Sequence, residues 1–447
     1  MKEVEDYSTN LQRMRIDEIK LENFKGFESE TFSFPSQFTV IIGNNASGKT
    51  SILDAIAVAA GSLFLGLDGA ESRNIQRDEI RLKWVDGDPR PQLPVLVSAI
   101  GSVSDKKGIT WRRRITSDQG RTTRKGAEAI ANLAKEMHQK YRSGSNAVIF
   151  PVIAYHGTGR LWAEHQEKVD YKKNTEHVLS GYKDCLSPKS SSKAFLTWYK
   201  TFYQDATNFD NKKDKTLLNT FNKTITKLIP EWYDMKYHYG LDQLIGFYKG
   251  EKGEERQQSF NNLSDGYRNM IGMAADVVYR CLKLNSHLGA NAVKETPGIV
   301  LIDELDLHLH PKWQRQVVKK LKETFPKVQF ICTTHSPFIV QSLNAEELIN
   351  LDGKVLAADP FKRSLEENAL YMGAETERGE RFQEKVNDAK RFDEILNKAV
   401  EAKSRSALSG EELQTLNDIL LKNSDDPALV ARLQIKRLSK LGLDETS

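Results

Sequence analysis

Four short runs along the chain consist almost entirely of apolar or β-branched residues: 39–42, 147–154, 299–302 and 328–332. Runs of this length without polar alternation predict strands that are covered on both faces. Three of them are followed by helix signals, either apolar residues at three- and four-residue spacing or a Ser-Pro helix start. Parallel strands joined by covering helices predict an α/β fold.

Other segments alternate between apolar and polar residues. Residues 16–27 and 31–34 predict two hairpin-like strands before the first buried run, and 93–100 and 108–115 predict two more after it. Strands with one polar face are typical of antiparallel sheets, so we expect an antiparallel lobe attached to the central, mixed sheet. A helical period over 127–141 predicts a further helix.

The first buried run leads into a loop of the form G-x-x-x-x-G-K-T, followed by a helix that stops near Gly61. Backbone N–H groups in such a loop curve around phosphates, and the helix N-terminus is aimed at the anion. We expect Lys49 to contact the β- and γ-phosphates of ATP, and the Thr50 hydroxyl to bind Mg²⁺. The predicted nucleotide-binding residues of this loop are Gly43, Asn44, Asn45, Ala46, Ser47, Gly48, Lys49, Thr50 and Ser51.

An acidic pair, Asp303 and Glu304, follows the buried run at 299–302. Ligands bind at the carboxyl ends of strands in open α/β sheets, so this pair is well placed for chemistry. We expect Asp303 to hold the Mg²⁺ shell and Glu304 to orient or deprotonate the water that attacks the γ-phosphate. His335 follows the run at 328–332 and is expected to contact the γ-phosphate.

Three further side chains, Asp306, His308 and His310, alternate after the acidic pair, and Pro311 then starts a predicted helix. They resemble a metal-binding pattern, but no further strong ligand is spaced to join them. We therefore favour loop and interface roles for these three residues.

The segment 262–268 (Asn-Leu-Ser-Asp-Gly-Tyr-Arg) precedes another predicted helix. On its own, Leu-Ser-x-Gly is a weak signal because Ser and Gly commonly cap helices. Together with the phosphate loop, the acidic pair and His335, in this order, it resembles the ABC-type ATPase heads of the RecF, SMC and OLD group. More narrowly, residues 155–162 and 303–311 are similar to the PtuA-type ATPases of Septu anti-phage systems and some retrons.

This resemblance covers roughly residues 14–355 and implies that two heads sandwich ATP. Ser264 and Gly266 of one protomer would then complete the site that contains Lys49 and Glu304 of the other. It implies a homodimer or higher homo-oligomer, an HNH nuclease subunit (PtuB-like) as partner, and also DNA or a retron reverse transcriptase with its DNA product. Asp265 stands where many transporters with this type of ATPase have glycine, and residues 155–160 are the candidate replacement for the usual glutamine loop.

The formal net charge is only +4, which neither requires nor excludes nucleic acid. The basic residues are concentrated around the predicted strands at 93–100 and 108–115, with Trp111 among them. Two interpretations are open, a surface for nucleic-acid phosphates or a solvated hairpin face. The basic residues in question are Lys106, Lys107, Arg112, Arg113, Arg114, Arg121, Arg124 and Lys125. Lys25 has a similar ambiguity, since it could lie near the nucleotide or in a solvated turn.

The three cysteines, Cys185, Cys281 and Cys332, show no metal-ligand spacing and predict reduced core thiols. The N-terminus is charged, and no run of about 18 apolar residues is present, so we expect a cytoplasmic protein that does not span a membrane.

We expect four segments: an ATPase lobe with the phosphate loop (14–162), a helical insertion (163–255), a second ATPase lobe (256–355) and a helical C-terminal region (356–447). Apolar residues recur at helical spacing over 382–400. That helix would bind a partner, support self-association or pack on its own ATPase domain. No glutamate followed by an acidic pair on alternating strands is found there, which argues against a self-contained nuclease of the OLD type.

The leading hypothesis is an ATP-hydrolysing regulatory subunit of an anti-phage complex that controls a separate HNH nuclease. The first alternative is a RecF- or SMC-like DNA repair ATPase. The second is a nucleotide-sensing scaffold with little turnover.

Overall fold

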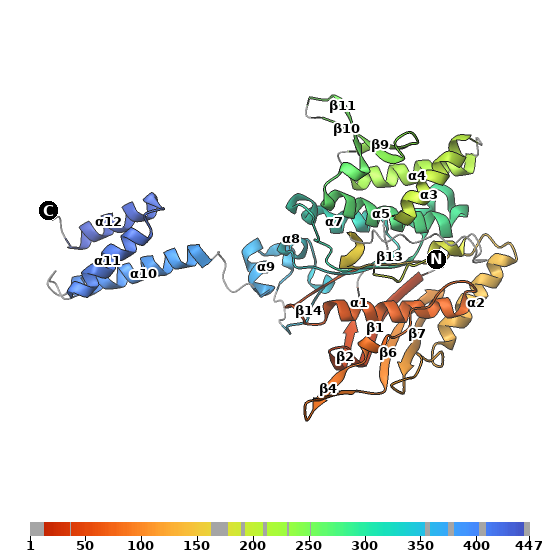
Figure 1. The fold of residues 1–447 in the computed structure, drawn as a ribbon, viewed down its shortest axis with the longest axis horizontal. Coiled ribbons are helices and arrows are strands. Elements are labelled where there is room, and N and C mark those ends of the chain that lie inside the picture. The colour runs from red at the N-terminus through yellow and green to blue at the C-terminus, as the bar shows by residue number, and fades with distance from the viewer. Residues whose placement is uncertain are drawn as a thin grey trace, which may run out of the picture. The chain divides into compact units, whose positions relative to one another are not determined.

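The computed structural model describes residues 13–35, 37–161, 178–188, 193–208, 212–229, 232–250, 252–353, 358–373, 380–401 and 408–441. The chain divides into two compact units, Met1–Asn368 and Ala369–Ser447 (Figure 1). Trp162, at the end of the predicted first ATPase lobe, and residues 163–177 of the predicted insertion lie outside the described residues.

A five-stranded parallel sheet forms the centre of the first unit, in the order β14-β3-β13-β12-β8. Its strands are β3 (Phe38–Ile42), β8 (Val152–His156), β12 (Gly298–Ile302), β13 (Val328–Thr333) and β14 (Leu348–Asn350). Every residue of β3, β8, β12 and β13 is buried, as the uninterrupted apolar runs predicted. Of the run predicted as a strand at 147–154, only residues 152–154 lie in β8. β8 is an edge strand, and Pro151 lies directly before it, where a missing N–H donor is tolerated.

The predicted antiparallel lobe is a four-stranded sheet in the order β2-β1-β6-β7. Its strands are β1 (Arg13–Phe24), β2 (Phe27–Ser33), β6 (Val95–Ser104) and β7 (Lys106–Ile115). Inward and outward side chains alternate in β7, where Trp111, Arg113 and Ile115 are buried while Arg112 is exposed. A separate hairpin, β4 (Leu82–Val85) and β5 (Asp88–Pro91), precedes β6 and was not predicted.

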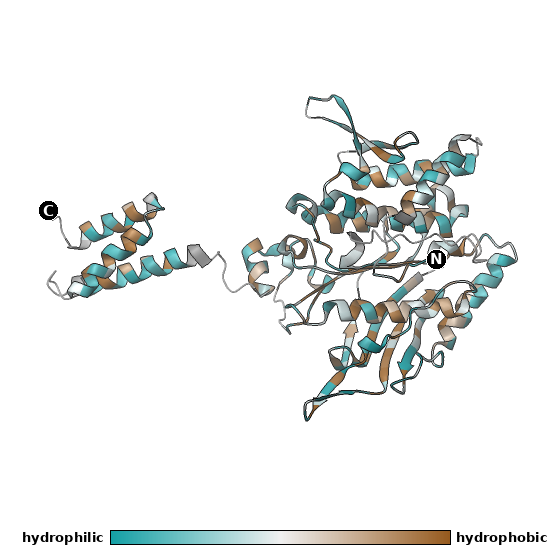
Figure 2. Ribbon diagram, in the orientation of Figure 1, coloured by the Kyte–Doolittle hydropathy of each residue, from teal (hydrophilic) through white to brown (hydrophobic). Residues whose placement is uncertain are grey.

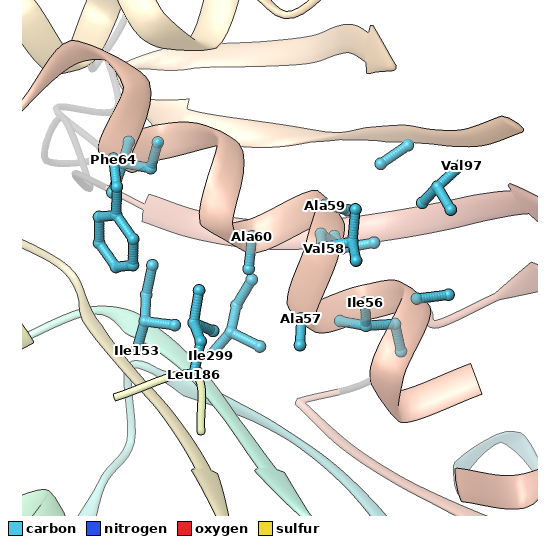
Figure 3. Packing of buried hydrophobic residues seen from close by; sticks show 14 of the residues in the cluster. Ile56, Ala57, Val58, Ala59, Ala60, Phe64, Val97, Ile153, Leu186 and Ile299 are labelled. Atoms are coloured by element: carbon cyan, nitrogen blue, oxygen red, sulfur yellow. The ribbon is translucent and has the colours of Figure 1, made fainter. Parts of the chain in front are cut away.

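Helix α1 (Lys49–Ala60) lies between the two sheets (Figure 3). Val97 of β6 lies on one side of the helix, and Ile153 and Ile299 of the parallel sheet lie on the other. Ten of its twelve residues are buried, and each large aliphatic side chain removed from water contributes about 1.5–3 kcal/mol. The Trp111 indole nitrogen donates to the Ala59 oxygen at 2.9 Å, which fixes α1 against β7.

Residues 49–66 are long and apolar enough to cross a membrane, and they are the only such stretch among the described residues. They are 78% buried inside the unit, and the core helix of a globular unit meets the same criterion. Figure 2 shows this helix as largely hydrophobic, in keeping with its place between the sheets.

The part of the predicted insertion that the structure describes contains both helices and strands. α3 (Lys193–Asn208) and α4 (Lys212–Leu228) are followed by a three-stranded antiparallel sheet. Its strands are β9 (Trp232–His238), β10 (Gln243–Lys249) and β11 (Glu255–Ser259). The helical expectation missed this sheet because its aromatic residues fit a helical stripe as well as a strand.

The remaining helices of the first unit cover its sheets or connect their strands. They are α2 (Glu128–Arg142), α5 (Asp265–Leu284), α6 (Ala292–Glu295), α7 (Pro311–Thr324), α8 (Pro337–Val340) and α9 (Leu365–Tyr371), the last of which continues into the second unit. All three cysteines are buried and none forms a disulfide, which agrees with the sequence-based expectation.

The second unit consists of α10 (Glu380–Glu401), α11 (Gly410–Lys422) and α12 (Pro427–Leu441). These helices enclose a small, separate hydrophobic core in which Phe392, Leu396, Leu416 and Leu433 are almost fully buried. The helix predicted over 382–400 is therefore present, and its residues Ala389, Phe392, Ile395 and Leu396 pack into the core of this unit.

Candidate active site

The phosphate loop connects β3 to α1 at the carboxyl edge of the parallel sheet. Ala46 and Gly48 have φ angles of 66° and 96°, in the left-handed region that a curled loop requires. A Cβ atom at Gly48 would also lie 2.5 Å from the ring of Phe27. Glycine is therefore required at this position by both backbone conformation and packing, and α1 begins directly after it.

Lys49 is buried, and its ammonium group lies over the loop. Its Nζ donates to the backbone oxygens of Gly43 at 2.7 Å and Asn44 at 2.9 Å. Burial lowers the pKa of Lys49, while nearby carboxylates act in the opposite direction. Those carboxylates belong to Asp303, Asp352 and Glu304. The lysine is thus held in place by backbone acceptors next to the loop's N–H groups, where a phosphate would lie.

Asp303 connects the phosphate loop to the second half of the site. Its Oδ2 accepts a hydrogen bond from the Thr50 hydroxyl at 2.9 Å, and its Oδ1 accepts one from the Thr333 hydroxyl at 2.6 Å. A hydroxyl and a carboxylate are the oxygen donors that Mg²⁺ prefers, so Thr50 and Asp303 fit this cation. No cluster of three His, Cys, Asp or Glu is found among the described residues, so phosphates and water would supply the other ligands.

Glu304 follows Asp303 with a φ of 50°, a conformation that costs a non-glycine residue about 1–3 kcal/mol. Its backbone N–H donates to the Thr333 hydroxyl at 2.7 Å. Asp303 N–H donates to the His156 oxygen at 2.8 Å, which ties the same turn to the end of β8. These bonds hold the strained turn, and the half-buried Glu304 side chain is accessible to water.

Asp306 organises the turn that carries His335. Its Oδ1 accepts from the Thr334 hydroxyl at 2.6 Å and from the backbone N–H of His335 at 3.1 Å. The His335 side chain itself is exposed, at the same edge of the sheet as the acidic pair. Sequence reasoning gave Asp306 only a general loop role. The sequence feature that could have identified Asp306 is its position two residues after Glu304. This position places it beside the end of β13, which precedes His335.

The start of α5 packs against the turn that follows the acidic pair. The Asn269 side chain donates to the Leu307 oxygen at 3.0 Å, and a Cβ atom at Gly266 would lie 2.1 Å from the His308 oxygen. Ser264 is the N-cap of α5 and is exposed. The contribution of Ser264 and Gly266 to a second protomer stays a prediction.

Lys25 lies in the turn between β1 and β2, and its side chain is half-buried and paired. It forms an ion pair with Asp54, one turn along α1 from Thr50, and lies 3.8 Å from Glu79. Arg73 bridges the same two carboxylates at 3.0 and 2.7 Å. Burial raises the pKa of Tyr155, whose hydroxyl is also hydrogen-bonded to Asp54. The end of β8 is thus linked to α1 through a buried group of charges.

Arg113, one residue of the basic stretch, does not belong to an exposed surface. Arg113 is 1% exposed, and its guanidinium donates to Thr123, Ser72 and Asn74. It lies on the inward side of β7 and is therefore a structural residue, since the strand alternation places it opposite its two arginine neighbours. Trp111 is buried in the same way. The exposed members of the stretch are Lys106, Lys107, Arg112, Arg121, Arg124 and Lys125.

A phosphate loop and an acidic pair at the carboxyl edge of one parallel sheet, with an antiparallel lobe beside it, define a P-loop NTPase of the ABC-ATPase head type. The sequence profile of the family described as "AAA domain, putative AbiEii toxin, Type IV TA system" matches residues 38–341. Septu protein PtuA from Bacillus thuringiensis is 41% identical over 363 residues, which cover 78% of each chain. The chain therefore belongs to this AAA-domain family, together with Septu protein PtuA.

The chain is also similar to a retron protein and to a solved SMC head. Retron Vc95 probable ATPase from Vibrio cholerae serotype O1 biovar El Tor is 26% identical over 416 residues, which cover 80% of this chain and 78% of that protein. The solved structure of an SMC head bound to the C-winged helix domain of ScpA aligns with a TM-score of 0.44 and 19% identity, over 75% of this chain and 94% of that one.

Proposed function

We propose that the chain binds ATP with Mg²⁺ and hydrolyses it to ADP and phosphate. The observation that supports this most directly is the hydrogen bond between Thr50 and Asp303, because it joins the phosphate loop to the acidic pair. Thr50 and Asp303 would hold Mg²⁺, which supplies charge neutralisation at the phosphates when bound. Lys49 lies where it can bind the β- and γ-phosphates.

Glu304 is proposed to accept a proton from the attacking water, whose oxygen forms the new bond to the γ-phosphorus while the bond to the ADP oxygen breaks. His335 would donate a hydrogen bond to the γ-phosphate. Ser264 and Gly266 of a second copy would close the site, as in two heads that sandwich the nucleotide. The exposed position of Ser264 is compatible with such a contact.

The biological setting is proposed from the relatives. Because Septu PtuA and a retron ATPase are similar over more than three quarters of the chain, we propose a regulatory ATPase of an anti-phage defence complex. Its partners would be a second copy of the chain and a separate HNH nuclease subunit. DNA, or a retron reverse transcriptase with its DNA product, is a further candidate partner.

Steady-state phosphate release by the purified chain tests the hydrolysis. Glu304→Gln should retain ATP affinity and lose turnover on the order of 10²-fold or more, because the carboxylate is removed and the site is otherwise preserved. Lys49→Ala should lose ATP binding. Equal phosphate release by the wild type and Glu304→Gln would exclude this mechanism and favour the scaffold hypothesis. Co-purification from the native host would distinguish a nuclease partner from DNA repair proteins.

A further inference from the structure

The hairpin β4–β5 extends from the end of the antiparallel sheet and forms a sheet of its own (Figure 1). Asp86 and Gly87 make its turn with φ angles of 52° and 85°, as in the tight turns that two-residue hairpins favour. It is anchored at its base, where the Arg81 N–H donates to the Asn23 oxygen at 2.9 Å. The rest of the hairpin is almost entirely exposed.

One side of this hairpin is apolar. Trp84 and Leu82 are 69% and 51% exposed, and they pair across the strands with Pro89 and Pro91. Because side chains alternate along a strand, these four residues share one face. Because the Trp84 indole stays mostly exposed, it contributes little hydrophobic free energy to folding. The stability of the hairpin therefore does not explain why a tryptophan is present at this position.

The opposite side carries Lys83 and Arg90, with Val85 and Asp88 on the same face nearer the turn. Lys83 and Arg90 are direct cross-strand partners, and like charges in this arrangement destabilise a hairpin. Neither forms an ion pair with any residue in the described part of the chain. A polyanion bound there would remove the repulsion.

The sequence around the hairpin has a larger net positive charge than the whole chain. Residues 72–126 contain 13 Lys or Arg and 6 Asp or Glu, a net charge of +7, so the other residues sum to −3 in a chain of +4. The hairpin ends at Pro91, and β6 begins four residues later, with Leu96 paired to Arg114. The loop that contains Arg121 and Arg124 returns along β7, since Thr123 N–H donates to the Arg114 oxygen at 2.9 Å.

We propose that the β4–β5 hairpin binds single-stranded nucleic acid, with Trp84 stacked on an unpaired base and Lys83 and Arg90 at the phosphates. The aromatic ring and the basic side chains lie on opposite faces of the same two-stranded hairpin, so a strand that crosses its edge would meet a surface for base stacking and then one for phosphates. Single strands are favoured over duplex because stacking needs an accessible base face. The inference does not depend on ATP hydrolysis.

The test is fluorescence anisotropy of a labelled oligo-dT with the full chain, measured over a range of salt concentrations. Trp84→Ala should weaken binding by about 5- to 150-fold, the range expected for one stacked base, and leave the salt dependence unchanged. Lys83→Glu with Arg90→Glu should weaken binding and reduce the slope of log K against log salt by roughly 1.4, about 0.7 for each phosphate that is no longer neutralised. Phe361→Ala, at a 50% exposed aromatic outside the charged segment, is the matched control.

Trp84→Tyr and Trp84→Leu separate stacking from general apolar contact. Tyr should retain most of the affinity and Leu should not, because both are apolar at this exposed site but only Tyr has a ring that can stack. Wild-type-like binding by Trp84→Leu or Trp84→Ala would overturn the proposal. So would loss of self-association or of a co-purifying protein in Trp84→Ala with the oligonucleotide affinity unchanged, which would assign the hairpin to a protein interface. Unchanged ATP affinity in all variants verifies that they fold.

Discussion

Gly266 and His308 are in direct contact: a Cβ atom at position 266 would lie 2.1 Å from the backbone oxygen of His308. The residue expected to reach a second protomer is therefore also packed against its own acidic turn. This contact connects the first residues of α5 to the segment that follows Glu304, within one chain. A substitution at the start of α5 is therefore expected to shift the segment that follows Glu304, and the reverse.

Gly266→Ala should destabilise the protein by about 1–3 kcal/mol, because the added methyl group has no space. Ser264→Ala removes an exposed side chain that makes no capping hydrogen bond, so its stability should change by less than about 0.5 kcal/mol. Thermal unfolding of both variants checks this difference. If the two variants unfold at the same temperature as the wild type, the close contact at Gly266 is wrong.

Asp303→Asn should reduce the part of ATP affinity that depends on Mg²⁺. Both carboxylate oxygens accept hydroxyl hydrogen bonds, from Thr50 and Thr333, and an amide can replace only one of them as an acceptor. Isothermal titration with ATP in the presence of Mg²⁺ and of EDTA measures the effect. The variant should bind nearly equally under the two conditions, whereas a wild-type response to Mg²⁺ would rule out Asp303 as part of the metal site.

Mixing Lys49→Ala with Ser264→Ala tests the composite site. Each variant alone should be nearly inactive, because both sites of its dimer are damaged. In a mixture, half of the dimers are mixed and contain one intact site, so turnover should recover to about a quarter of the wild-type value. Phosphate release at several mixing ratios gives the result. No recovery, with subunit exchange verified, would place Ser264 in the same protomer's site or outside any site.

Arg113→Ala should cost about 2–3 kcal/mol of unfolding free energy, because it leaves a cavity and unsatisfied acceptors at Thr123, Ser72 and Asn74. Arg112→Ala, on the exposed side of the same strand, should have little effect on stability. Urea unfolding of the pair measures the difference. Equal stability would contradict the burial of Arg113.

The strand-loop-helix around Lys49 and the strands before Asp303 and His335 could be predicted from the sequence. Their signals are local, since apolar runs, glycine spacing and helix starts are fixed by neighbouring residues. The β9–β11 sheet lacks such a local signal and was not predicted. Its aromatic residues fit a helical as well as a strand period, and only the pairing between the strands identifies it as a sheet.

By itself, the sequence determined which residues form the phosphate loop and the acidic pair, and therefore the class of the protein, and it predicted a γ-phosphate contact for His335. Only the tertiary structure decided that Asp306 holds the His335 turn, 29 residues away, that Lys25 pairs with Asp54, and that Arg113 is buried beside exposed arginines. These outcomes depend on which segments meet in space. Hydrogen bonds and burial between distant parts of the chain have no local pattern that a sequence could display.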